Sequence, residues 1–428
     1  MTPLSVRVGL LGCGNVGAAL VELVRSRADD IAARTGLRLE VARVAVRSVA
    51  KERPVELAPE LLTHDAAGVV VAPDIDVVVE VIGGVEPARE LVLAALKAGK
   101  SVVTANKELL ANAGAELFAA AEDAGVDLLF EAAVGGGIPF IRPLRESLAG
   151  ERIDRVLGIV NGTTNYILTR MTESGVSYGE ALGEAQRLGY AERDPTADVE
   201  GHDAAAKAAI IASIAFGARV VAGDVYNEGI ADITSADIAY ARKMGYVIKL
   251  LAIAERDGDE VGVRVHPAMV PVDHPLASVR DSFNAMFVEG SAVGELMFYG
   301  RGAGGFPSAS AVLGDLIDAA ANRRKSSHAS VGVLGKARLR PIDEVWSAYY
   351  LNIEVADRPG VLAAVAGAFG EHGVSIRSME QEGLGDEARI VFITHLAREA
   401  DVQATVRDLH HLDAVDRITS VLRVVGTV

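Results

Sequence analysis

The chain has 428 residues, of which 58 are acidic and 42 basic, giving a formal charge of −16 at pH 7. That length predicts about two to three domains, and half of the residues are hydrophobic, which is enough for sizeable cores. Because the acidic balance repels polyanions, we predict no nucleic-acid partner. The short basic run 323–325 is interpreted as a solvated linker, with a nucleic-acid patch as the alternative.

The cysteine count and the apolar stretches bear on the compartment. Cys13 is the single cysteine, which excludes an intramolecular disulfide and a structural zinc site built from several cysteines. The first residues lack a charged segment followed by an apolar one, and the longest apolar stretch, 208–218, stops at Arg219. We therefore expect a globular, soluble, cytoplasmic protein that is neither secreted nor membrane-spanning.

The first predicted element is a strand at 6–11, which runs into a glycine-rich loop and then into an alanine-rich helix. This order is typical of a dinucleotide-binding βαβ unit, in which the glycines permit a tight turn, close approach to the pyrophosphate and helix packing. The alternative is a glycine-rich turn without a ligand. The predicted cofactor-binding residues of this loop are Gly12, Gly14, Asn15, Val16 and Gly17.

Residues 1–145 alternate strand-like and helix-like segments, which predicts an α/β fold with a doubly wound parallel sheet of the Rossmann type. Further strands are predicted at 39–46, 76–81, 101–104 and 127–130, and helices at 18–34, 88–98 and 113–124. The continuous apolar run at 76–81 suits a strand that is covered on both faces.

The end of the second strand bears on the choice of dinucleotide. NAD-binding units place an acidic side chain there to accept the ribose hydroxyls, whereas an arginine suits the 2′-phosphate of NADP. Here the strand ends at Arg47, Lys51 follows, and no acidic residue stands at the tip. The sequence therefore favours NADP and leaves use of NAD open. The alternative is that both cations only solvate a loop.

Polar groups also follow two later strands. Lys107 ends the segment 104–107 at the carboxyl end of a predicted strand, where open α/β sheets place ligands, and it could meet cofactor or substrate. Glu131 opens the glycine-rich segment 131–139, which precedes the polar run 161–165. Such glycines suit a hard cation held by backbone oxygens plus Glu131, a close approach of substrate, or a tight hinge between domains. The sequence alone leaves these three open.

The third polar segment, 192–207, is an acidic loop that enters an apolar helix. Asp203 and Lys207 are four residues apart and share a helical face. An exposed ion pair is one interpretation. The residues that follow in the helix are too apolar for it to be broadly exposed, so we interpret Lys207 as a lysine positioned to act as an acid or base. Glu192, Asp198 and Asp203 could hold a substrate ammonium. His202 is an alternative acid/base whose side chain points off this face.

The remainder predicts two more domains and a connection. Residues 146–321 form an α+β domain with helices at 204–216 and 310–321, the last helix packing back on the first domain from about 308. The loop 299–307 could cover the cofactor or be a domain-crossing turn. Residues 322–344 are predicted as a linker. Residues 345–428 predict a ferredoxin-like βαββαβ domain, with strands at 346–356, 374–381, 389–396 and 420–425 and helices at 359–372 and from 399.

Taken in order, these motifs strongly resemble the homoserine dehydrogenase family over essentially the first 320 residues, and the stretch 355–376 resembles the start of an ACT domain. No aspartate-kinase segment precedes them, so the resemblance is to the monofunctional form. It implies NAD(P)-dependent interconversion of L-homoserine and L-aspartate 4-semialdehyde, on the route to threonine, isoleucine and methionine. It also implies a homodimer or homotetramer.

The resemblance assigns roles to individual residues. Lys207 is implied to donate a proton to the aldehyde oxygen, Lys107 to lie between cofactor and substrate, and Glu192 and Asp203 to hold the substrate, with Asp198 close by. The predicted catalytic residues are therefore Lys207, Lys107 and Asp203. The other implied substrate-binding residues are Gly162 and Thr163, and the other cofactor-binding ones are Gly83, Thr104, Gly302 and Gly304. A sodium ion is implied at Glu131, Val134, Gly136 and Ile138, mostly through backbone oxygens.

The ACT resemblance implies regulation. Threonine is the expected effector, bound where two such domains pair, with exposed N–H groups at the turn 357–362 available to its carboxylate. The alternative is an oligomerisation module without an effector.

Two rival functions make different predictions. A semialdehyde dehydrogenase that forms an acyl phosphate needs a cysteine nucleophile, and Cys13 lies in the pyrophosphate loop instead. A non-catalytic sensor of nucleotide and amino acid, built on the same domains, would show no turnover, and the intact pair of Asp203 and Lys207 argues against it.

Cys13 stands where family members often carry another small or apolar residue. We hypothesise that its modification alters cofactor affinity.

Overall fold

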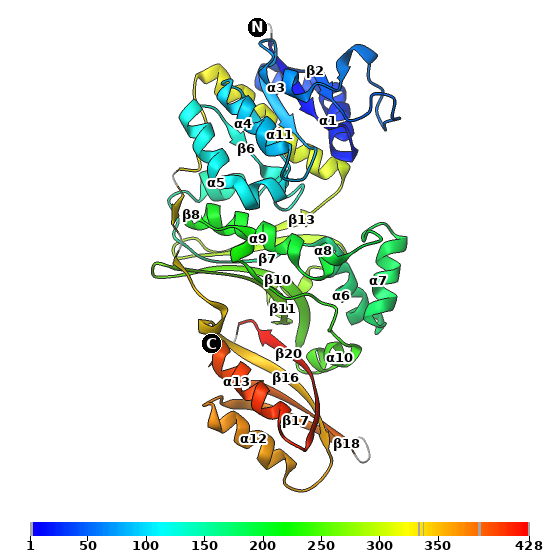
Figure 1. Cartoon of the computed structure of the whole chain (residues 1–428), viewed down its shortest axis with the longest axis vertical. Helices are drawn as coiled ribbons and strands as arrows, with labels where there is room; N and C mark the ends of the chain where they lie inside the picture. Colours follow the sequence, from blue (N-terminus) through cyan, green and yellow to red (C-terminus); the bar gives the residue numbers. More distant parts are fainter. Residues whose placement is uncertain (1–2, 333, 337, 384–386, 427–428) are drawn as a thin grey trace.

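The computed structural model describes residues 3–332, 334–336, 338–383 and 387–426. Figure 1 shows an elongated molecule in which the N-terminal, middle and C-terminal units follow one another along the long axis. Most strands belong to a six-stranded sheet in the N-terminal unit and a twelve-stranded sheet shared by the other two units. Within the described ranges, no helix combines the length and the apolar character needed to cross a membrane.

The N-terminal unit is built on a sheet with the strand order β3-β2-β1-β4-β5-β6, and all its strand pairs are parallel. The strands are β1 (Leu4–Leu11), β2 (Leu37–Ala45), β3 (Leu62–Thr63), β4 (Val77–Glu80), β5 (Ser101–Thr104) and β6 (Leu128–Leu129). The chain direction across the sheet switches between β1 and β4, and open α/β sheets bind ligands at the carboxyl ends beside such a switch. The predicted doubly wound sheet is confirmed.

The helices of this unit differ from prediction at three places. The helices are α1 (Asn15–Ser26), α2 (Ala28–Thr35), α3 (Ala66–Val71), α4 (Ala88–Lys97) and α5 (Lys107–Ala124), of which α3 is not among the predicted helices. The predicted single helix 18–34 is wrong, because the backbone of Arg27 leaves the helical region and separates α1 from α2. The predicted helix 113–124 starts earlier, because the Asn106 side chain accepts a hydrogen bond from the Leu109 N–H at 3.1 Å and caps α5. Lys107 is therefore the first residue of α5.

The middle unit has five long strands, in the order β13-β12-β7-β10-β11. They are β7 (Ile153–Ile159), β10 (Tyr246–Asp257), β11 (Glu260–Pro271), β12 (Phe283–Gly290) and β13 (Gly294–Arg301). The helices are α6 (Gly162–Ser174), α7 (Tyr178–Arg187), α8 (Thr196–Val199), α9 (His202–Phe216) and α10 (Ser235–Lys243), and the short strands are β8 (Ala218–Arg219) and β9 (Tyr226–Asn227). The alanine-rich α9 packs between this sheet and α5, because small side chains allow close approach on both sides.

The chain then returns to the N-terminal unit through α11 (Gly305–Lys325), the yellow helix that lies along α1 in Figure 1. The apolar face of α11, with Val312 and Leu316, joins the core beneath β1. This helix starts before and ends after the predicted range 310–321. The first residues of the predicted linker 322–344 are therefore helical.

The rest of the predicted linker is also held in place. Two short strands, β14 (Gly335–Lys336) and β15 (Arg338–Leu339), pair with β8 and β11. Residues 333 and 337 of this segment lie outside the described residues.

The C-terminal unit has the strand order β20-β16-β18-β17 with two helices, which confirms the βαββαβ prediction. Its elements are β16 (Trp346–Ala356), α12 (Val361–Glu371), β17 (Ile376–Gly383), β18 (Glu387–Thr394), β19 (Ala397–Arg398), α13 (Glu399–His410) and β20 (Val415–Val424). The last strand starts earlier than the predicted 420–425. It also pairs in parallel with β11, through Ala268 and Arg423, so one sheet runs through both units.

Buried polar contacts fasten the C-terminal unit to the middle one. The fully buried carboxylate of Asp237 on α10 accepts hydrogen bonds from the Tyr350 hydroxyl at 3.1 Å, the Asn352 amide at 3.0 Å and the Ser420 hydroxyl. Since an unpaired buried carboxylate is costly, these contacts fix one relative position of the two units.

Candidate active site

The glycine loop has the shape that close approach of a ligand requires. Gly12 has φ +94°, and a Cβ on it would lie 2.8 Å from the Val81 carbonyl oxygen, while a Cβ on Gly17 would lie 2.4 Å from the oxygen of Gly12. A Cβ on Gly14 would meet only open space. Gly12 and Gly17 are thus required by packing. Gly14 leaves the start of α1, which no described side chain caps, open to an anion.

Cys13, within the glycine loop, is half-buried. Burial raises the pKa of its thiol, with Arg53 and Arg25 opposing that shift. The thiol is therefore largely protonated at neutral pH, a state that reacts slowly with alkylating agents. The environment of Cys13 thus gives no support to the hypothesis that its modification controls cofactor affinity.

A cavity of about 500 Å³ extends from the glycine loop to the end of β2. Its cationic lining residues are Arg47, Lys51 and Arg53, with His64 beside them, and no carboxylate lines it among the described residues. The Arg53 guanidinium donates to the backbone oxygens of Lys51 at 2.7 Å and Val49 at 3.2 Å, which holds the loop after β2 in shape. This donor set fits a phosphorylated ribose. The sequence pattern did not predict Arg53 or His64 as site residues, although both follow β2, the strand whose end predicted Arg47 and Lys51.

At the carboxyl ends of β4 and β5, a buried glutamate organises the switch-point loop. Glu80 accepts hydrogen bonds from the N–H groups of Ile82 at 2.8 Å and Gly83 at 3.2 Å, and from the Thr104 hydroxyl at 2.6 Å. The side chain of Thr104 and the N–H of Gly83 are thus engaged inside the protein. Contacts of these two predicted residues with a cofactor would have to come from other atoms. Sequence reasoning missed Glu80, which looked like part of an apolar strand.

The carboxylate of Asp203 lies between two lysines. The Nζ of Lys107 is 2.7 Å from Oδ1, and the Nζ of Lys207 is 2.7 Å from Oδ2. Lys207, which is buried, also donates to the Val160 carbonyl oxygen at 2.6 Å. The Asn161 side chain donates to Asp203 at 2.9 Å. The structure thereby brings together α5, α6 and α9 at one charged cluster.

The electrostatics of this cluster favour its ionised state. Burial by itself would raise the pKa of Asp203, but the ammonium groups of Lys207 and Lys107 hold that pKa well below its usual range. Burial would lower the pKa of Lys107, and Asp203 outweighs it, so the pKa of Lys107 is raised. The Asp203 carboxylate therefore stays charged across the neutral range and keeps both lysines in position.

Three of the predicted substrate residues surround the start of α6. Asn161 caps this helix and donates to Asp198 Oδ1 at 2.7 Å, which links Asp198 to the cluster. The Thr163 hydroxyl donates to the Tyr190 carbonyl oxygen at 2.7 Å. A Cβ on Gly162 would lie 2.7 Å from the Ser282 carbonyl oxygen, so no side chain fits there. Asn161 itself was missed as a site residue, although an asparagine before Gly-Thr-Thr is a helix-cap signal.

Two other residues of the acidic segment lie outside the cluster. The side chain of Glu192 is exposed and has no hydrogen bond or ion pair with the described residues, while its backbone oxygen accepts from Gln186. His202 is exposed and pairs with Glu200 at 3.3 Å. This placement agrees with ranking His202 below Lys207 as an acid/base.

The side chain of Glu131 has a structural role. The Glu131 carboxylate accepts hydrogen bonds from the N–H groups of Phe140, Ile141 at 2.7 Å and Arg142 at 2.8 Å. Any contribution of Glu131 to a cation would therefore come from its backbone oxygen. The carbonyl oxygens of Val134, Gly136 and Ile138 are on buried residues, and no described hydrogen-bond donor reaches them. Buried unpaired carbonyls fit a hard monovalent cation.

The loop before α11 lies against both the cation segment and the glycine loop. A Cβ on Gly136 would lie 2.4 Å from the Gly302 oxygen, and one on Gly305 would lie 3.1 Å from the Asn15 oxygen. Gly304, at φ +124°, makes the turn into α11. The loop 302–305 therefore crosses to the pyrophosphate-binding side of the N-terminal unit, where a cofactor contact of Gly302 and Gly304 is possible.

The chain combines a dinucleotide-type loop with a lysine held on an aspartate, and Lys107 at the carboxyl end of the sheet connects the unit that carries the loop to that aspartate. Hydride transfer at a carbonyl requires both a redox cofactor and a proton donor. These features define an NAD(P)-dependent oxidoreductase.

Comparison with known proteins agrees. Family models match at residues 12–131 (homoserine dehydrogenase, NAD binding domain), 139–317 (homoserine dehydrogenase) and 349–413 (ACT domain). Homoserine dehydrogenase of Corynebacterium glutamicum is 53% identical over 98% of this chain and 95% of its own length. That of Bacillus subtilis is 42% identical over 99% of each chain.

Solved structures extend the comparison. A crystal structure of a homoserine dehydrogenase from Thiobacillus denitrificans superposes with a TM-score of 0.94 at 42% identity, covering 100% of both chains. A hyperthermophilic archaeal homoserine dehydrogenase in complex with NADPH gives a TM-score of 0.64 at 29% identity, covering 74% of this chain and 98% of that one. The chain belongs to the homoserine dehydrogenase family and carries a C-terminal ACT domain, as its motifs predicted.

Proposed function

We propose that the chain reversibly reduces L-aspartate 4-semialdehyde to L-homoserine, with NADP as the preferred dinucleotide and Lys207 as the general acid. The contact of Asp203 with both lysines carries this proposal. An ammonium group has three N–H donors, and those of Lys207 go to the Val160 oxygen and to Asp203, which leaves one for the substrate. Lys207 would donate this proton to the aldehyde oxygen during reduction and recover it from the hydroxyl during oxidation.

Asp203 acts in this proposal as a positioning residue, because both of its oxygens contact lysines. The substrate ammonium is then left to Asp198, with Gly162 and Thr163 at the start of α6, and to the exposed Glu192 outside the cluster. Lys107 is partly exposed and contacts Asp203 with one donor, so its remaining N–H groups face substrate or cofactor. Bound NADPH would supply the hydride to the aldehyde carbon.

The direct test of this function is loss of NADPH absorbance in the presence of aspartate semialdehyde, with homoserine identified by mass spectrometry. Turnover with no homoserine formed would contradict the proposed reaction. No turnover with either NADPH or NADH would favour the non-catalytic sensor.

The same assay in sodium, potassium and choline buffers tests the proposed monovalent cation at the carbonyls of Val134, Gly136 and Ile138. Equal rates and equal thermal stability in all three buffers would contradict a cation there.

The preference for NADP has its own prediction. Arg47→Glu replaces a cation of the cavity after β2 by an anion, so it should lower kcat/KM with NADPH about tenfold or more, while kcat/KM with NADH changes little. The matched control is Arg34→Glu, which makes the same change on the exposed side of α2, outside the cavity lining. A parallel loss with both dinucleotides would show that Arg47 does not read the 2′-phosphate.

We propose further that threonine binds the ACT domain and lowers the rate. The turn into α12 supports this, because Gly360 (φ +92°) caps the helix without a side-chain hydrogen bond. The Val361 N–H bonds the Arg358 oxygen at 3.4 Å, and the N–H groups that follow it in the first turn are open to a carboxylate. L-threonine should inhibit the intact enzyme and D-threonine should not, as measured by initial rates. Identical rates with both enantiomers and without either would leave the ACT domain an assembly module.

Pairing of ACT domains between chains would also produce the proposed homodimer or homotetramer, which light scattering can measure. Removing the residues beyond Pro341 is a poor test of regulation, because it would strip β20 from β11 and expose the buried Asp237. A cytoplasmic location stays a prediction.

A further inference from the structure

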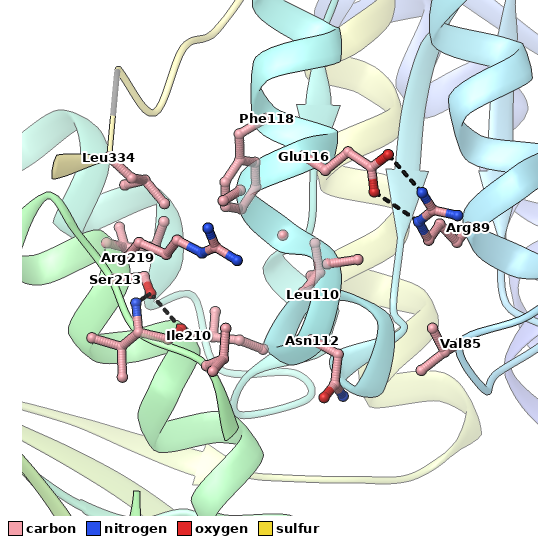
Figure 2. A pocket seen from close by; sticks show the side chains of 16 residues that line it. Val85, Arg89, Leu110, Asn112, Glu116, Phe118, Ile210, Ser213, Arg219 and Leu334 are labelled. Atoms are coloured by element: carbon pink, nitrogen blue, oxygen red, sulfur yellow. Dashed lines mark hydrogen bonds and ion pairs between the residues drawn. The ribbon is translucent and has the colours of Figure 1, made fainter. Parts of the chain in front are cut away.

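A cavity of about 310 Å³ lies between the N-terminal and middle units, apart from the charged cluster (Figure 2). One wall is α5, through Leu110, Gly114 and Phe118, and the other is α9, through Ile210 and Ile214. The segment after β8 and a residue of the connection to the ACT domain, Leu334, close it.

The two walls are the helices that carry the proposed catalytic lysines. Lys107 is the first residue of α5, and Asp203 and Lys207 lie in the first turns of α9. The ion pair between Lys107 and Asp203, 2.7 Å long, therefore joins the two helices at one end, and the cavity separates them further along. A ligand bound in the cavity would therefore contact the same two helices that this ion pair joins.

The chemistry of the lining is apolar with one available cation. Figure 2 shows the Arg219 side chain extending from β8 into the space between α9 and α5. Its guanidinium makes no ion pair or hydrogen bond with the residues that the structure describes. The other polar side chains of the lining already have contacts within the protein. The Asn112 amide nitrogen donates to the Glu108 carbonyl oxygen at 2.7 Å, and only its amide oxygen is left without a donor among the described residues. Both oxygens of Glu116 accept from Arg89 at 2.7 Å, and the Ser213 hydroxyl bonds the backbone of Val220 at 3.2 Å.

We propose that this cavity binds a small aliphatic carboxylate. Its carboxylate pairs with Arg219, and its branched alkyl body lies against Leu110, Ile210 and Ile214. The lining carboxylate, Glu116, already pairs with Arg89, so the cavity offers an ammonium group no free carboxylate and only the amide oxygen of Asn112. A simple carboxylic acid therefore fits better than an α-amino acid, which separates this ligand from an ACT effector. Binding spreads α5 from α9 and weakens the contact of Lys107 with Asp203.

Binding is tested by calorimetric titration of the intact chain with 4-methylpentanoate, which should bind with a Kd of about 1 mM, as expected for a ligand of this size. The uncharged analogue 4-methylpentan-1-ol should bind about tenfold more weakly, because it loses one charge-assisted contact. The amino acid leucine should also bind about tenfold more weakly, because its ammonium group finds no carboxylate in the cavity. Equal binding of acid and alcohol, or no saturable binding of the acid, overturns the site.

Two variants locate the ligand. Arg219→Met removes the cation at nearly constant length and should weaken 4-methylpentanoate binding about tenfold. Ala113→Phe places a ring in the cavity and should abolish it. Arg34→Met, on the exposed side of α2, is the matched control and should bind like the parent chain. Unchanged binding in the first two variants, with unchanged thermal unfolding, overturns the assignment.

The coupling to catalysis rests on the proposed function, whereas the binding does not. With saturating 4-methylpentanoate, kcat/KM for aspartate semialdehyde should fall several-fold in the parent chain and be unaffected in Arg219→Met. Binding without any change in kcat/KM overturns the coupling. Absence of turnover in the parent chain before any ligand is added would instead contradict the proposed function and leave the titration as the test of the site.

Discussion

Replacing Lys207 by methionine is expected to lower kcat about 10²- to 10⁴-fold, the range that a positioned general acid contributes. Methionine keeps the length and the apolar stem of the side chain, so the buried end of α9 retains its packing. Asp203 keeps its contacts with Lys107 and Asn161, and the cluster therefore retains one cation for its carboxylate. The measurement is single-turnover oxidation of NADPH by aspartate semialdehyde. The affinity for NADPH, from nucleotide fluorescence, should be unchanged.

Two further variants separate a proton donor from a positive charge and from a merely buried lysine. Lys207→Arg retains the charge, but a guanidinium does not release its proton near neutral pH, so it should remain as impaired as the methionine variant. Lys100→Met removes another buried lysine, whose ammonium donates to the Ala72 and Ile75 carbonyl oxygens at 2.7 and 2.6 Å. It should lower stability and leave kcat near that of the parent. Substantial turnover in Lys207→Met would refute the acid/base assignment.

The sequence predicted the members of this cluster better than their geometry. Asp203 and Lys207 are joined by helical spacing, a local property that a periodic pattern reveals. The contact of Lys107 with Asp203 depends on how α5 packs on α9, and no local pattern encodes that packing. Polar residues buried within apolar strands are similarly hidden. Glu80 reads as one residue of a valine run, yet it holds the switch-point loop through two backbone N–H groups.

The fold shows the same division between local and long-range causes. The Rossmann-type and βαββαβ patterns are visible because each strand and helix carries its own hydrophobic period. One of the errors lies where polar residues mask the hydrophobic pattern of a strand. The last strand is predicted at 420–425 but starts at Val415 in the structure. The prediction misses its first half because exposed polar residues such as Arg417 break the apolar pattern there. The pairing of β20 with β11 joins two units through segments that are far apart in the sequence. The hydrophobic pattern of each segment, taken one after another, does not predict such a pairing.

At the junction of β20 with β11, one arginine connects the ACT domain to the middle unit. Arg423 is buried, and it lies 2.8 Å from Glu399 of the ACT domain and 2.9 Å from Glu228 of the middle unit. Its guanidinium also stands 5.4 Å above the ring of Tyr226. Burial alone would lower the pKa of Arg423, but the two carboxylates raise it, so the residue is charged at every pH at which the protein is folded.

Arg423→Met is expected to lower the stability of this junction by about 3 to 5 kcal/mol, because it leaves the buried Glu399 carboxylate without its cation. The measured quantity is the opening free energy of the β11 and β20 amides by native-state hydrogen exchange, which isolates this part of a multidomain chain. Adding Glu399→Gln removes the uncompensated charge, so the double variant should be more stable than Arg423→Met alone.

The matched control lies on the same strand. Arg417 pairs with Glu354 at 3.1 Å, but 64% of its side chain is exposed, so Arg417→Met should cost at most about 1 kcal/mol. The contrast between the two arginines follows from what remains around each carboxylate. Glu354 keeps its pair with Arg389 at 2.8 Å and some contact with water, whereas the buried Glu399 beside Arg423 has no second cation among the described residues and is shielded from water. Equal losses in the two variants, or no recovery in the double variant, would mean that apolar packing of β20 on β11 holds the ACT domain in place and that Arg423 contributes through its alkyl stem.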